Sequence, residues 1–255
     1  MDFSKKAREK IFNLKNLDAD KLLYHVMPRF IMELMRKYFR MEVEGLENLP
    51  KKGPFIIAPN HSGYAGFDAF CIMHEVQKAT GRTPKTMTHP LWFLSPTTSI
   101  PAEKVGFFEA TTKNGIKLLS DGNILLLFPE GEYGNFKPTI QKYKLQEFKR
   151  GFVRLAVYTG VPIIPTVVLG AEETHINLTE LKFTKFLKGT ILPLPLNVLP
   201  LPARWKIKFL KPIYLPYKSS AATDSELMHE LASDIRERLQ AAIRKELKSR
   251  KSIFL

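Results

Sequence analysis

Short apolar runs alternate along the chain with longer stretches in which apolar residues recur at helical spacing. The runs at 55–59 and 124–128 are uninterrupted, which is typical of strands buried on both faces of a sheet. Three further strands are expected at 42–44, 163–169 and 205–210. Between residues 85 and 101, the Pro and Thr content predicts irregular structure with one short strand at 86–88.

Helices are expected between the strands and at both ends of the chain. The internal helices cover residues 68–80, 112–120 and 152–158. This alternation predicts an α/β fold with a largely parallel central sheet flanked by helices. A long C-terminal helix follows a capping box at 223–226. Its apolar ridge from Leu227 to Leu247 steps by four residues, which favours packing on the core over binding of a partner helix.

An N-terminal helical segment precedes the first strand. Residues 20–40 carry apolar side chains such as Phe30 and Leu34 together with basic ones, and Pro28 interrupts the pattern. Such a helix docks on the rest of the chain or lies in a lipid interface, and the two roles can coexist on opposite faces. We therefore divide the chain into a docking or membrane-associating segment at 1–40 and a domain at 41–255.

A histidine follows the first uninterrupted run. His61 leaves the strand, enters a loop with two glycines, and is followed by Asp68 at the start of the next helix. A neighbouring carboxylate orients an imidazole, and the pKa of histidine suits a general base near neutral pH. The alternative is a loop histidine with an aspartate N-cap. Phe128-Pro129-Glu130-Gly131 follows the second run, at the same edge of a parallel sheet, where ligand sites form.

Four short segments occur in the order and at about the spacings of one known family. They are Asn60-His61 with Asp68, Val105-Gly106-Phe107-Phe108, Phe128-Pro129-Glu130-Gly131 and Val161-Pro162-Ile163-Ile164-Pro165. Over about residues 41–215 the chain resembles the glycerolipid acyltransferase family, which includes the lysophosphatidate acyltransferases. The resemblance implies an acyltransferase domain at 41–255. It also implies transfer of a fatty acyl group from acyl-CoA or acyl-carrier protein to the hydroxyl of a lysophospholipid or lysophosphatidate.

The resemblance assigns roles within these segments. His61 is expected to be the general base that deprotonates the acceptor hydroxyl, while Asp68 fixes its tautomer and stabilises the imidazolium. Backbone N–H groups from Ser62 to Gly66 are candidate donors to the tetrahedral oxyanion. Glu130 and Gly131 are expected to shape the acceptor end of the site, with the glutamate accepting hydrogen bonds from glycerol hydroxyls.

One departure from the family pattern is the spacing of the first segment. Six residues instead of four separate His61 from Asp68, and the loop glycines can absorb the extra length. Two other classes of function compete with acyl transfer. With water as the acceptor, the chain is a lipid or thioester hydrolase, although it has no Gly-x-Ser-x-Gly elbow. A membrane-binding module without activity leaves the pairing of His61 with Glu130 unexplained.

A second departure concerns phosphate recognition. The family's phosphate-binding arginines are absent, because the corresponding places read Glu109-Ala110-Thr111-Thr112 and Glu132-Tyr133-Gly134. Lys113 and Lys137 are the nearest cationic substitutes, unless both are solvated surface lysines. A lysine lacks the planar fork with which arginine binds phosphate, so a neutral mono- or diacylglycerol is the alternative acceptor.

A Pro- and Leu-rich stretch at 191–202 is expected to be extended, because its alternating prolines exclude a helix and a central strand. It follows a mixed basic and apolar segment at 183–188. The stretch is either a membrane-contacting loop or an arm packed over a groove. Both arrangements place apolar surface where an acyl chain can lie.

The composition of the 255 residues narrows the partners. The formal net charge of +14 suits nucleic acid, anionic lipid or an acidic carrier protein. The sequence has no nucleic-acid-binding motif, so an anionic membrane surface is favoured over nucleic acid. A soluble protein with a basic surface is the alternative. We expect no cofactor and no metal, since Cys71 is the only cysteine and no Cys/His cluster has the spacing of zinc ligands.

The hydropathy of the chain indicates whether it spans a membrane or binds at its surface. Residues 1–21 carry charges throughout and lack the apolar stretch of a secretion signal. No stretch approaches the ~18–20 apolar residues that a spanning helix needs. We therefore expect a peripheral protein on the cytoplasmic face of a membrane.

Overall fold

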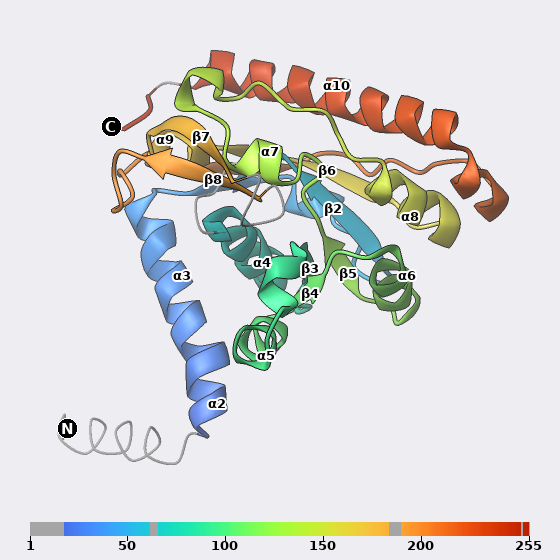
Figure 1. Cartoon of the computed structure of the whole chain (residues 1–255), viewed down its shortest axis with the longest axis horizontal. Helices are drawn as coiled ribbons and strands as arrows, with labels where there is room; N and C mark the ends of the chain where they lie inside the picture. Colours follow the sequence, from blue (N-terminus) through green and yellow to red (C-terminus); the bar gives the residue numbers. More distant parts are fainter. Residues whose placement is uncertain (1–17, 62–65, 184–189, 251, 255) are drawn as a thin grey trace.

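The computed structural model describes residues 18–61, 66–183, 190–250 and 252–254, which form helices around a seven-stranded sheet (Figure 1). The spatial order of the strands is β1-β9-β6-β2-β5-β3-β4. Their bounds are Glu42–Glu44 (β1), Phe55–Pro59 (β2), Lys85–Thr88 (β3), Phe107–Glu109 (β4), Ile124–Leu126 (β5), Ile163–Leu169 (β6) and Lys206–Phe209 (β9).

Five neighbouring strands, from β6 to β4, run parallel to one another. At the other end of the sheet β9 runs antiparallel to β6, and β1 runs parallel to β9. The expected α/β fold with a largely parallel sheet is therefore confirmed. Strand β2 pairs with β5 on one side and with β6 on the other, so the loops after these three strands leave from one edge of the sheet.

Helices cover both faces of the sheet (Figure 1). One core cluster packs α6 (Thr112–Ser120), α8 (Gly151–Thr159) and α10 (Ser225–Ser249) against the sheet. The other packs α3 (Met27–Tyr38), α4 (Phe67–Thr80) and α5 (Pro96–Lys104). Along β2, Phe55 and Ile57 belong to the second cluster, whereas Ile56 and Ala58 belong to the first. A strand with two buried faces reads as the uninterrupted apolar run of the sequence.

The remaining elements are short. Helix α7 covers Glu132–Asn135 and α9 covers Ala171–Thr174, and both begin at the edge where β5 and β6 end. Short 3₁₀ turns lie at Leu46–Asn48, Pro90–Phe93, Thr139–Gln141 and Ser219–Thr223.

Helix α5 corrects the expectation of irregular structure from 85 to 101. The short strand expected there is confirmed as β3, but residues 96–104 are helical. Pro96 lies in the first turn, where a backbone N–H has no helical partner to lose. Pro101 lies inside the helix, and the neighbouring Ala102 is buried in the second core cluster. Tertiary packing therefore outweighs the unfavourable helix propensity of proline.

The C-terminal helix α10 packs on the core as its ridge predicts. Its buried side chains include Met228, Ile235, Leu239 and Ile243. The N-cap is Asp224 rather than the first residue of the expected capping box, and its carboxylate accepts the N–H groups of the first turn.

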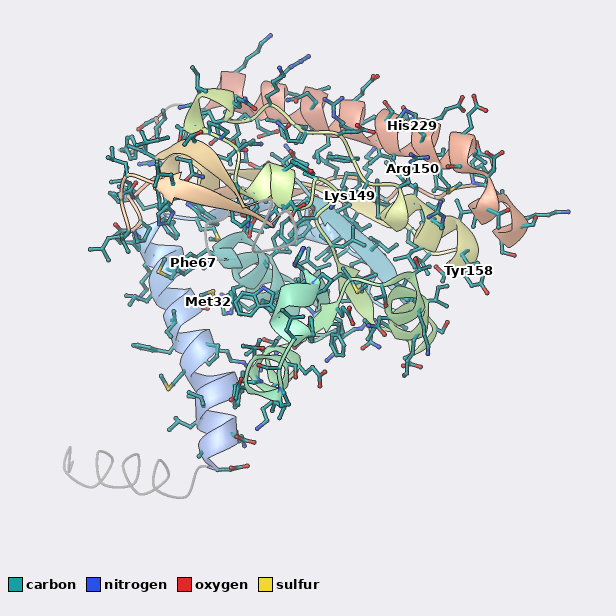
Figure 2. All side chains as sticks on the ribbon, viewed as in Figure 1. Met32, Phe67, Lys149, Arg150, Tyr158 and His229 are labelled. Atoms are coloured by element: carbon teal, nitrogen blue, oxygen red, sulfur yellow. The ribbon has the colours of Figure 1, made fainter. Side chains whose placement is uncertain are left out.

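The N-terminal helix docks on the domain. A short helix α2 (Ala19–Lys21) and a π-helical turn at Leu22–Val26 lead into α3, with Pro28 in its first turn. Met32, which Figure 2 labels on α3, is buried in the second core cluster. Arg36 forms an ion pair with Glu75 of α4 at 2.9 Å. Helix α3 therefore packs against the domain, whereas the role of the segment at 1–40 and a domain boundary at residue 40 stay predictions.

The Pro- and Leu-rich stretch begins as a strand. Strand β8 (Thr190–Pro195) pairs antiparallel with β7 (Asn177–Phe183) in a separate two-stranded sheet. A two-stranded sheet has only edge strands, where proline is tolerated. The expected extended conformation is confirmed for these residues. Residues 184–189 of the preceding segment lie outside the described residues.

Candidate active site

His61 is held at three points directly after β2. Its backbone N–H donates to Glu130 Oε1 at 3.0 Å, and its Nδ1 lies 2.7 Å from Asp68 Oδ2. The ring stacks on Phe128, with 3.9 Å between the ring centroids. The side chain is 14% exposed, so part of the imidazole reaches the surface.

Asp68 contacts His61 although six residues separate them in the sequence. Gly66 has a left-handed conformation, with φ 77°, and ends the loop at the N-terminus of α4. In the first turn of α4, one oxygen of Asp68 accepts the N–H of Ala69 at 2.8 Å while the other meets the imidazole. The carboxylate is fully buried. With Nδ1 facing this carboxylate, Nε2 is the nitrogen that can take a proton from a substrate.

Asn60 extends the sheet beyond the end of β2. Its side-chain amide donates to the carbonyl of Val168 at 2.9 Å, and its amide oxygen accepts the N–H of Val168 at 2.7 Å. This side chain imitates a backbone peptide and ties the residue before His61 to β6. The sequence pattern assigned Asn60 no role, because its partner is more than a hundred residues away.

Glu130 supports the site from inside the protein. Oε1 accepts the N–H of His61, and Oε2 accepts the N–H of Gln146 at 2.7 Å. The residue is fully buried. Its expected role as an acceptor for glycerol hydroxyls is therefore corrected: both oxygens already bind backbone N–H groups, which fixes where His61 leaves the sheet.

Gly131 forms the turn between Glu130 and α7. Its φ of 60° and ψ of −147° are accessible mainly to glycine. A Cβ atom at this position would lie 2.9 Å from Lys149 Nζ, so the lysine side chain passes directly over the turn. Lys149 is exposed, and its backbone N–H donates to the carbonyl of Pro129 at 2.8 Å. Figure 2 labels it on the segment that leads into α8.

The two lysines expected at the site differ in their surroundings. Lys113 is exposed in the first turn of α6, which follows the parallel strand β4 and so begins at the same sheet edge as His61. Lys137 is buried, with its side chain 3% exposed and Nζ 3.0 Å from Glu172 Oε1. The interpretation of Lys137 as a solvated lysine is wrong, and its burial also withdraws it from contact with a substrate phosphate.

Glu132 stands where the family has an arginine. Its carboxylate oxygen Oε2 lies 3.8 Å from Nε2 of His89, which follows β3. Both side chains therefore lie at the sheet edge that carries His61. An acidic group at this place does not replace a phosphate-binding guanidinium.

Glu172 belongs to the site but was not predicted from the sequence. It lies in the first turn of α9, shortly after β6, and its Oε2 accepts the N–H of Tyr143 at 2.7 Å. Burial raises the pKa of Glu172 to about 7, although the neighbouring Lys137 acts in the opposite direction. The signal that the sequence offered was an acidic pair, Glu172-Glu173, directly after an apolar strand.

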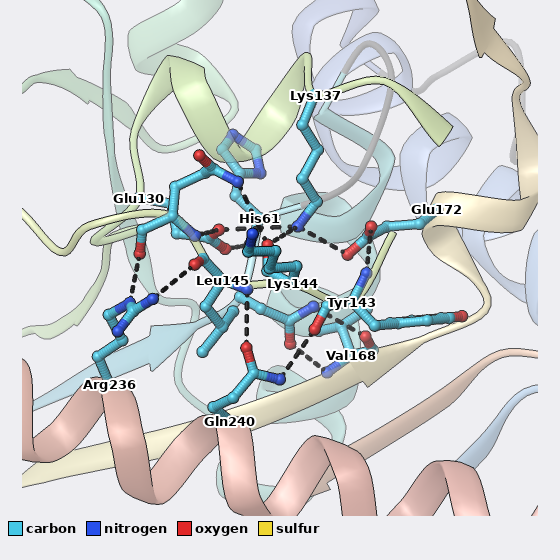
Figure 3. A network of polar contacts seen from close by, with 12 residues as sticks. His61, Glu130, Lys137, Tyr143, Lys144, Leu145, Val168, Glu172, Arg236 and Gln240 are labelled. Atoms are coloured by element: carbon cyan, nitrogen blue, oxygen red, sulfur yellow. Dashed lines mark hydrogen bonds and ion pairs between the residues drawn. The ribbon is translucent and has the colours of Figure 1, made fainter. Parts of the chain in front are cut away.

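Helix α10 fixes the segment that carries Gln146 (Figure 3). Arg236 donates to the carbonyls of Leu145 and Gln146, at 2.9 and 2.8 Å. Gln240 accepts the N–H of Leu145 and donates to the carbonyl of Tyr143, both at 2.9 Å. The long helix thereby supports Glu130, and through it the backbone of His61.

The candidate oxyanion donors cannot be placed in the same way, because residues 62–65 lie outside the described residues. Among the residues that the structure describes, no group of three or more His, Cys, Asp or Glu side chains is arranged to hold a metal ion. Cys71 is buried in the core.

Comparison with known proteins places this geometry in a family. The Acyltransferase family model matches residues 40–169. An uncharacterized protein of Mycobacterium tuberculosis is 34% identical over 233 residues, which cover 86% of this chain and 65% of the relative. The chain thus spans just under two thirds of that relative's length. A 1-acyl-sn-glycerol-3-phosphate acyltransferase of Limnanthes alba is 27% identical over 171 residues, which cover 64% of this chain and 53% of the relative.

The fold is similar to a solved structure. The crystal structure of the 1-acyl-sn-glycerophosphate acyltransferase PlsC from Thermotoga maritima superposes with a TM-score of 0.58 at 19% identity, over 97% of this chain and 90% of that chain. At this identity the likeness concerns the fold. Because the family model covers more than half of the residues, the chain belongs to the Acyltransferase family, and the expected membership among the glycerolipid acyltransferases is confirmed.

Proposed function

We propose that the protein transfers a fatty acyl group from an acyl thioester to the hydroxyl of a lysophosphatidate-like lipid, with His61 as the general base. The observation that carries this proposal is the 2.7 Å contact between His61 Nδ1 and the buried Asp68 carboxylate. This contact leaves Nε2 for proton transfer in a partly exposed ring. The same arrangement of imidazole and carboxylate serves as a base in many acyl-transfer enzymes.

In the proposed reaction, Nε2 of His61 takes the proton of the acceptor hydroxyl as its oxygen attacks the thioester carbonyl carbon. A tetrahedral oxyanion forms, and Asp68 stabilises the imidazolium. When the intermediate collapses, the carbon–sulfur bond breaks and the leaving thiolate takes the proton from the imidazolium. The products are the acylated lipid and free CoA or free carrier protein.

A phosphorylated acceptor is the leading candidate, supported by the membership of the family and by exposed cations at the sheet edge. Lys113 begins α6 at this edge, and Lys149 lies over the turn at Gly131. Both lysines are exposed, so a ligand can reach their ammonium groups. They come from outside the two motif positions where the family's arginines are expected.

A neutral mono- or diacylglycerol is the second candidate, and two observations favour it. Lys137 is withdrawn into an ion pair with Glu172, and Glu132 stands near His89 where the family has an arginine. Lone lysines bind phosphate less specifically than an arginine fork does. The most informative measurement is therefore which lipid acceptor the protein acylates.

We further propose that the protein works at an anionic membrane surface on the cytoplasmic side. Among the described residues, no helix is long and apolar enough to cross a bilayer. The outer face of α3, together with the π-helical turn before it, exposes a row of apolar side chains: Leu23, Met27, Phe30, Leu34 and Tyr38. The row continues into the Pro- and Leu-rich stretch, because the hydroxyl of Tyr38 donates to the carbonyl of Pro200 at 2.6 Å.

Beyond Tyr38 the exposed apolar surface is formed by Leu196, Val198 and Leu199. Exposed basic residues of the same helix region, Arg29, Lys37 and Arg40, suit anionic headgroups. An apolar surface with a basic margin is typical of proteins that lie in the interface of a bilayer. Such a location delivers lipid acceptors to the sheet edge.

One experiment tests the proposed function directly. The protein is incubated with labelled acyl-CoA, or acyl-carrier protein, and separately with lysophosphatidate, monoacylglycerol and diacylglycerol in vesicles. Label in phosphatidate supports the leading candidate, and faster labelling of a neutral glyceride supports the second. Free fatty acid without any acylated lipid identifies a hydrolase and contradicts both. His61→Ala protein in the same assay controls for contaminating activity.

A further inference from the structure

A buried lysine lies between two buried carboxylates behind the candidate active site (Figure 3). Lys137 Nζ is 3.0 Å from Glu172 Oε1 and 3.7 Å from Glu130 Oε2, and it donates to the carbonyl of Lys144 at 3.3 Å. The three charged side chains are each less than 7% exposed. We refer to Glu130, Lys137 and Glu172 as the buried charge cluster.

In the part of the chain that the structure describes, the space beside the cluster is too small for a lipid headgroup. The cavity beside it has a volume of about 20 Å³ and is lined by Asn135, Lys137, Glu172, His175 and four other residues. This volume holds about one water molecule, which is far less than a phosphate or a glycerol needs. Lys137 therefore acts on the protein itself and not on the acceptor.

Each carboxylate of the cluster holds the backbone through an N–H group. Glu130 accepts the N–H groups of His61 and Gln146, one on each oxygen, and Glu172 accepts the N–H of Tyr143. A carboxylate accepts these bonds more strongly than a neutral carboxyl group does. Two buried carboxylates that lie near one another raise each other's pKa unless a cation compensates them. Lys137 is the cation that lies between them.

We propose that Lys137 is a positioning residue for acyl transfer: its ammonium keeps Glu130 in the carboxylate form that fixes the backbone of His61. The inference rests on the proposed function of His61 as the base. It assigns to Lys137 an effect on turnover through Glu130, without contact to either substrate.

Removal of the ammonium has a defined consequence. Without it, two buried carboxylates lie near one another with no cation between them, which disfavours their charged forms. The hydrogen bonds that Glu130 accepts then weaken, from Gln146 on the oxygen nearer Lys137 and from His61 on the other oxygen. His61 thereby loses one of its three restraints. Because the position of His61 depends on the Glu130 carboxylate, the acid limb of the pH–rate profile is expected to move to higher pH.

Other titratable and charged groups near the buried charge cluster can also affect the pH–rate profile. His175 lines the same cavity, and Lys149 lies over the neighbouring Gly131. On the far side of Tyr143, Arg250 pairs with Glu173. Because these groups carry charge near the cluster, variants must be compared with the wild type at every pH.

The test compares Lys137→Met, Lys137→Arg and Glu172→Gln with the wild type, using labelled acyl-CoA and the preferred acceptor from pH 5 to pH 9. Lys117→Met is the matched control, because Lys117 is an exposed lysine paired with Asp121 on α6. We expect Lys137→Met to lower kcat by roughly ten- to a hundredfold with little change in KM, as a displaced catalytic group does. We expect its acid limb to move to higher pH, with partial recovery in Lys137→Arg.

Glu172→Gln keeps the proposal testable if Lys137→Met does not fold. This variant removes the Glu172 carboxylate, so that Lys137 pairs with Glu130 only. The acid limb of the pH–rate profile is then expected to move to lower pH. The double variant Lys137→Met/Glu172→Gln is expected to regain part of the kcat that Lys137→Met loses. A merely structural lysine would change the melting temperature in these variants and leave the pH profile in place.

A readout that does not depend on activity separates this inference from the proposed function. The backbone amide proton of His61, followed by NMR in isotope-labelled protein, reports the hydrogen bond to Glu130. We expect its shift to titrate at higher pH in Lys137→Met than in the wild type. One outcome is that the wild type transfers no acyl group while the His61 amide shift still changes at higher pH in Lys137→Met. In that case the proposed function fails, and the link from Lys137 to His61 stands.

Two results overturn the inference. One is an unchanged His61 amide titration together with an unchanged pH profile in folded Lys137→Met. The other is a rise in KM confined to phosphorylated acceptors at constant kcat, which would make Lys137 a substrate ligand.

Discussion

At the edge where β2, β5 and β6 end, charged side chains are buried: Asp68 and Glu130 are fully inaccessible, and Lys137 is 5% exposed. On the outer face of α3 the opposite holds, because Phe30 is 71% and Leu34 57% exposed. Buried charges and exposed apolar rows are the departures from ordinary burial that indicate function. The first region is arranged for chemistry on a few atoms, and the second for contact with an extended apolar surface.

The two regions also differ in how they are held. The charged edge depends on hydrogen bonds between segments that are far apart in the sequence, such as Glu130 with His61 and with Gln146. The outer face of α3 needs only a helix docked by its opposite side, through Met32 and the Arg36–Glu75 ion pair. Substitutions in one region should therefore leave the other region's property intact.

The largest expected effect is the loss of turnover in His61→Ala. Removal of the base should lower the rate of acyl transfer by roughly two to four orders of magnitude. Binding to anionic vesicles should be unchanged, because the outer face of α3 is untouched. Steady-state kinetics and vesicle sedimentation on the same preparation check both statements. Near-normal turnover in a well-folded variant would exclude His61 as the base.

Asp68→Asn should have the next largest effect. The amide keeps the shape of the side chain but no longer stabilises the imidazolium or fixes the tautomer of His61, so most of the activity should be lost. Circular dichroism and the melting temperature control for folding, because one oxygen of Asp68 also accepts the N–H of Ala69 at the start of α4. Full activity would reduce Asp68 to a helix cap.

A third prediction changes the outer face of α3 and leaves the active site intact: Phe30→Glu combined with Leu34→Glu. Two charges in the apolar row should weaken sedimentation with anionic vesicles by roughly tenfold or more, because they oppose burial in the interface and repel the headgroups. Turnover of a water-soluble short-chain acceptor should persist. Tyr158→Glu is the matched control, since Tyr158 is exposed on α8, on the other side of the molecule from α3 (Figure 2).

Salt sharpens the same test. Screened attraction between the basic chain and anionic lipid should release the wild type progressively as ionic strength rises. Equal binding to neutral and anionic vesicles at low salt would contradict the electrostatic part of the membrane proposal.

The exposed lysines at the sheet edge, Lys113 and Lys149, should determine which lipid acceptor is preferred. If a phosphate is recognised there, Lys149→Ala or Lys113→Ala should raise the KM for lysophosphatidate by roughly tenfold, on the order of 1.4 kcal/mol of binding. The KM for monoacylglycerol should be unchanged in the same variants. Unaltered KM values in both, with faster acylation of the neutral glyceride, would assign the protein to neutral acceptors.

The smallest expected effect is on the pH dependence of stability. The pKa of Glu172 is raised from 4.5 to about 7 by burial, so between these values the folded state binds a proton that the unfolded state has released. Stability from this group is present below about pH 4.5 and is lost as the pH rises towards 7. Glu172→Gln should flatten this part of the profile, as thermal melts from pH 4.5 to pH 8 will show. A wild-type profile that rises over this range would contradict it.

The features of this protein that depend on local pattern can be predicted from its sequence. Uninterrupted apolar runs defined β2 and β5, because strands with two buried faces need apolar side chains at every position. The ridge of α10 followed from its spacing, and the order of four motifs identified the family. His61 and Asp68 were found because both lie in one short segment, and seven residues are enough to bring them together.

The roles of the charged residues, in contrast, follow from the packing of the folded chain. Whether a lysine is solvated depends on partners that are distant in the sequence, and Lys137 is buried because Glu172 lies beside it. Glu130 could be recognised as part of a motif, but its two N–H partners follow from the packing of β2 and of the segment that α10 supports. The helix at 96–104 likewise overrides its prolines through contacts in the core. Burial and charge pairing are properties of the packed chain, and a local pattern does not contain them.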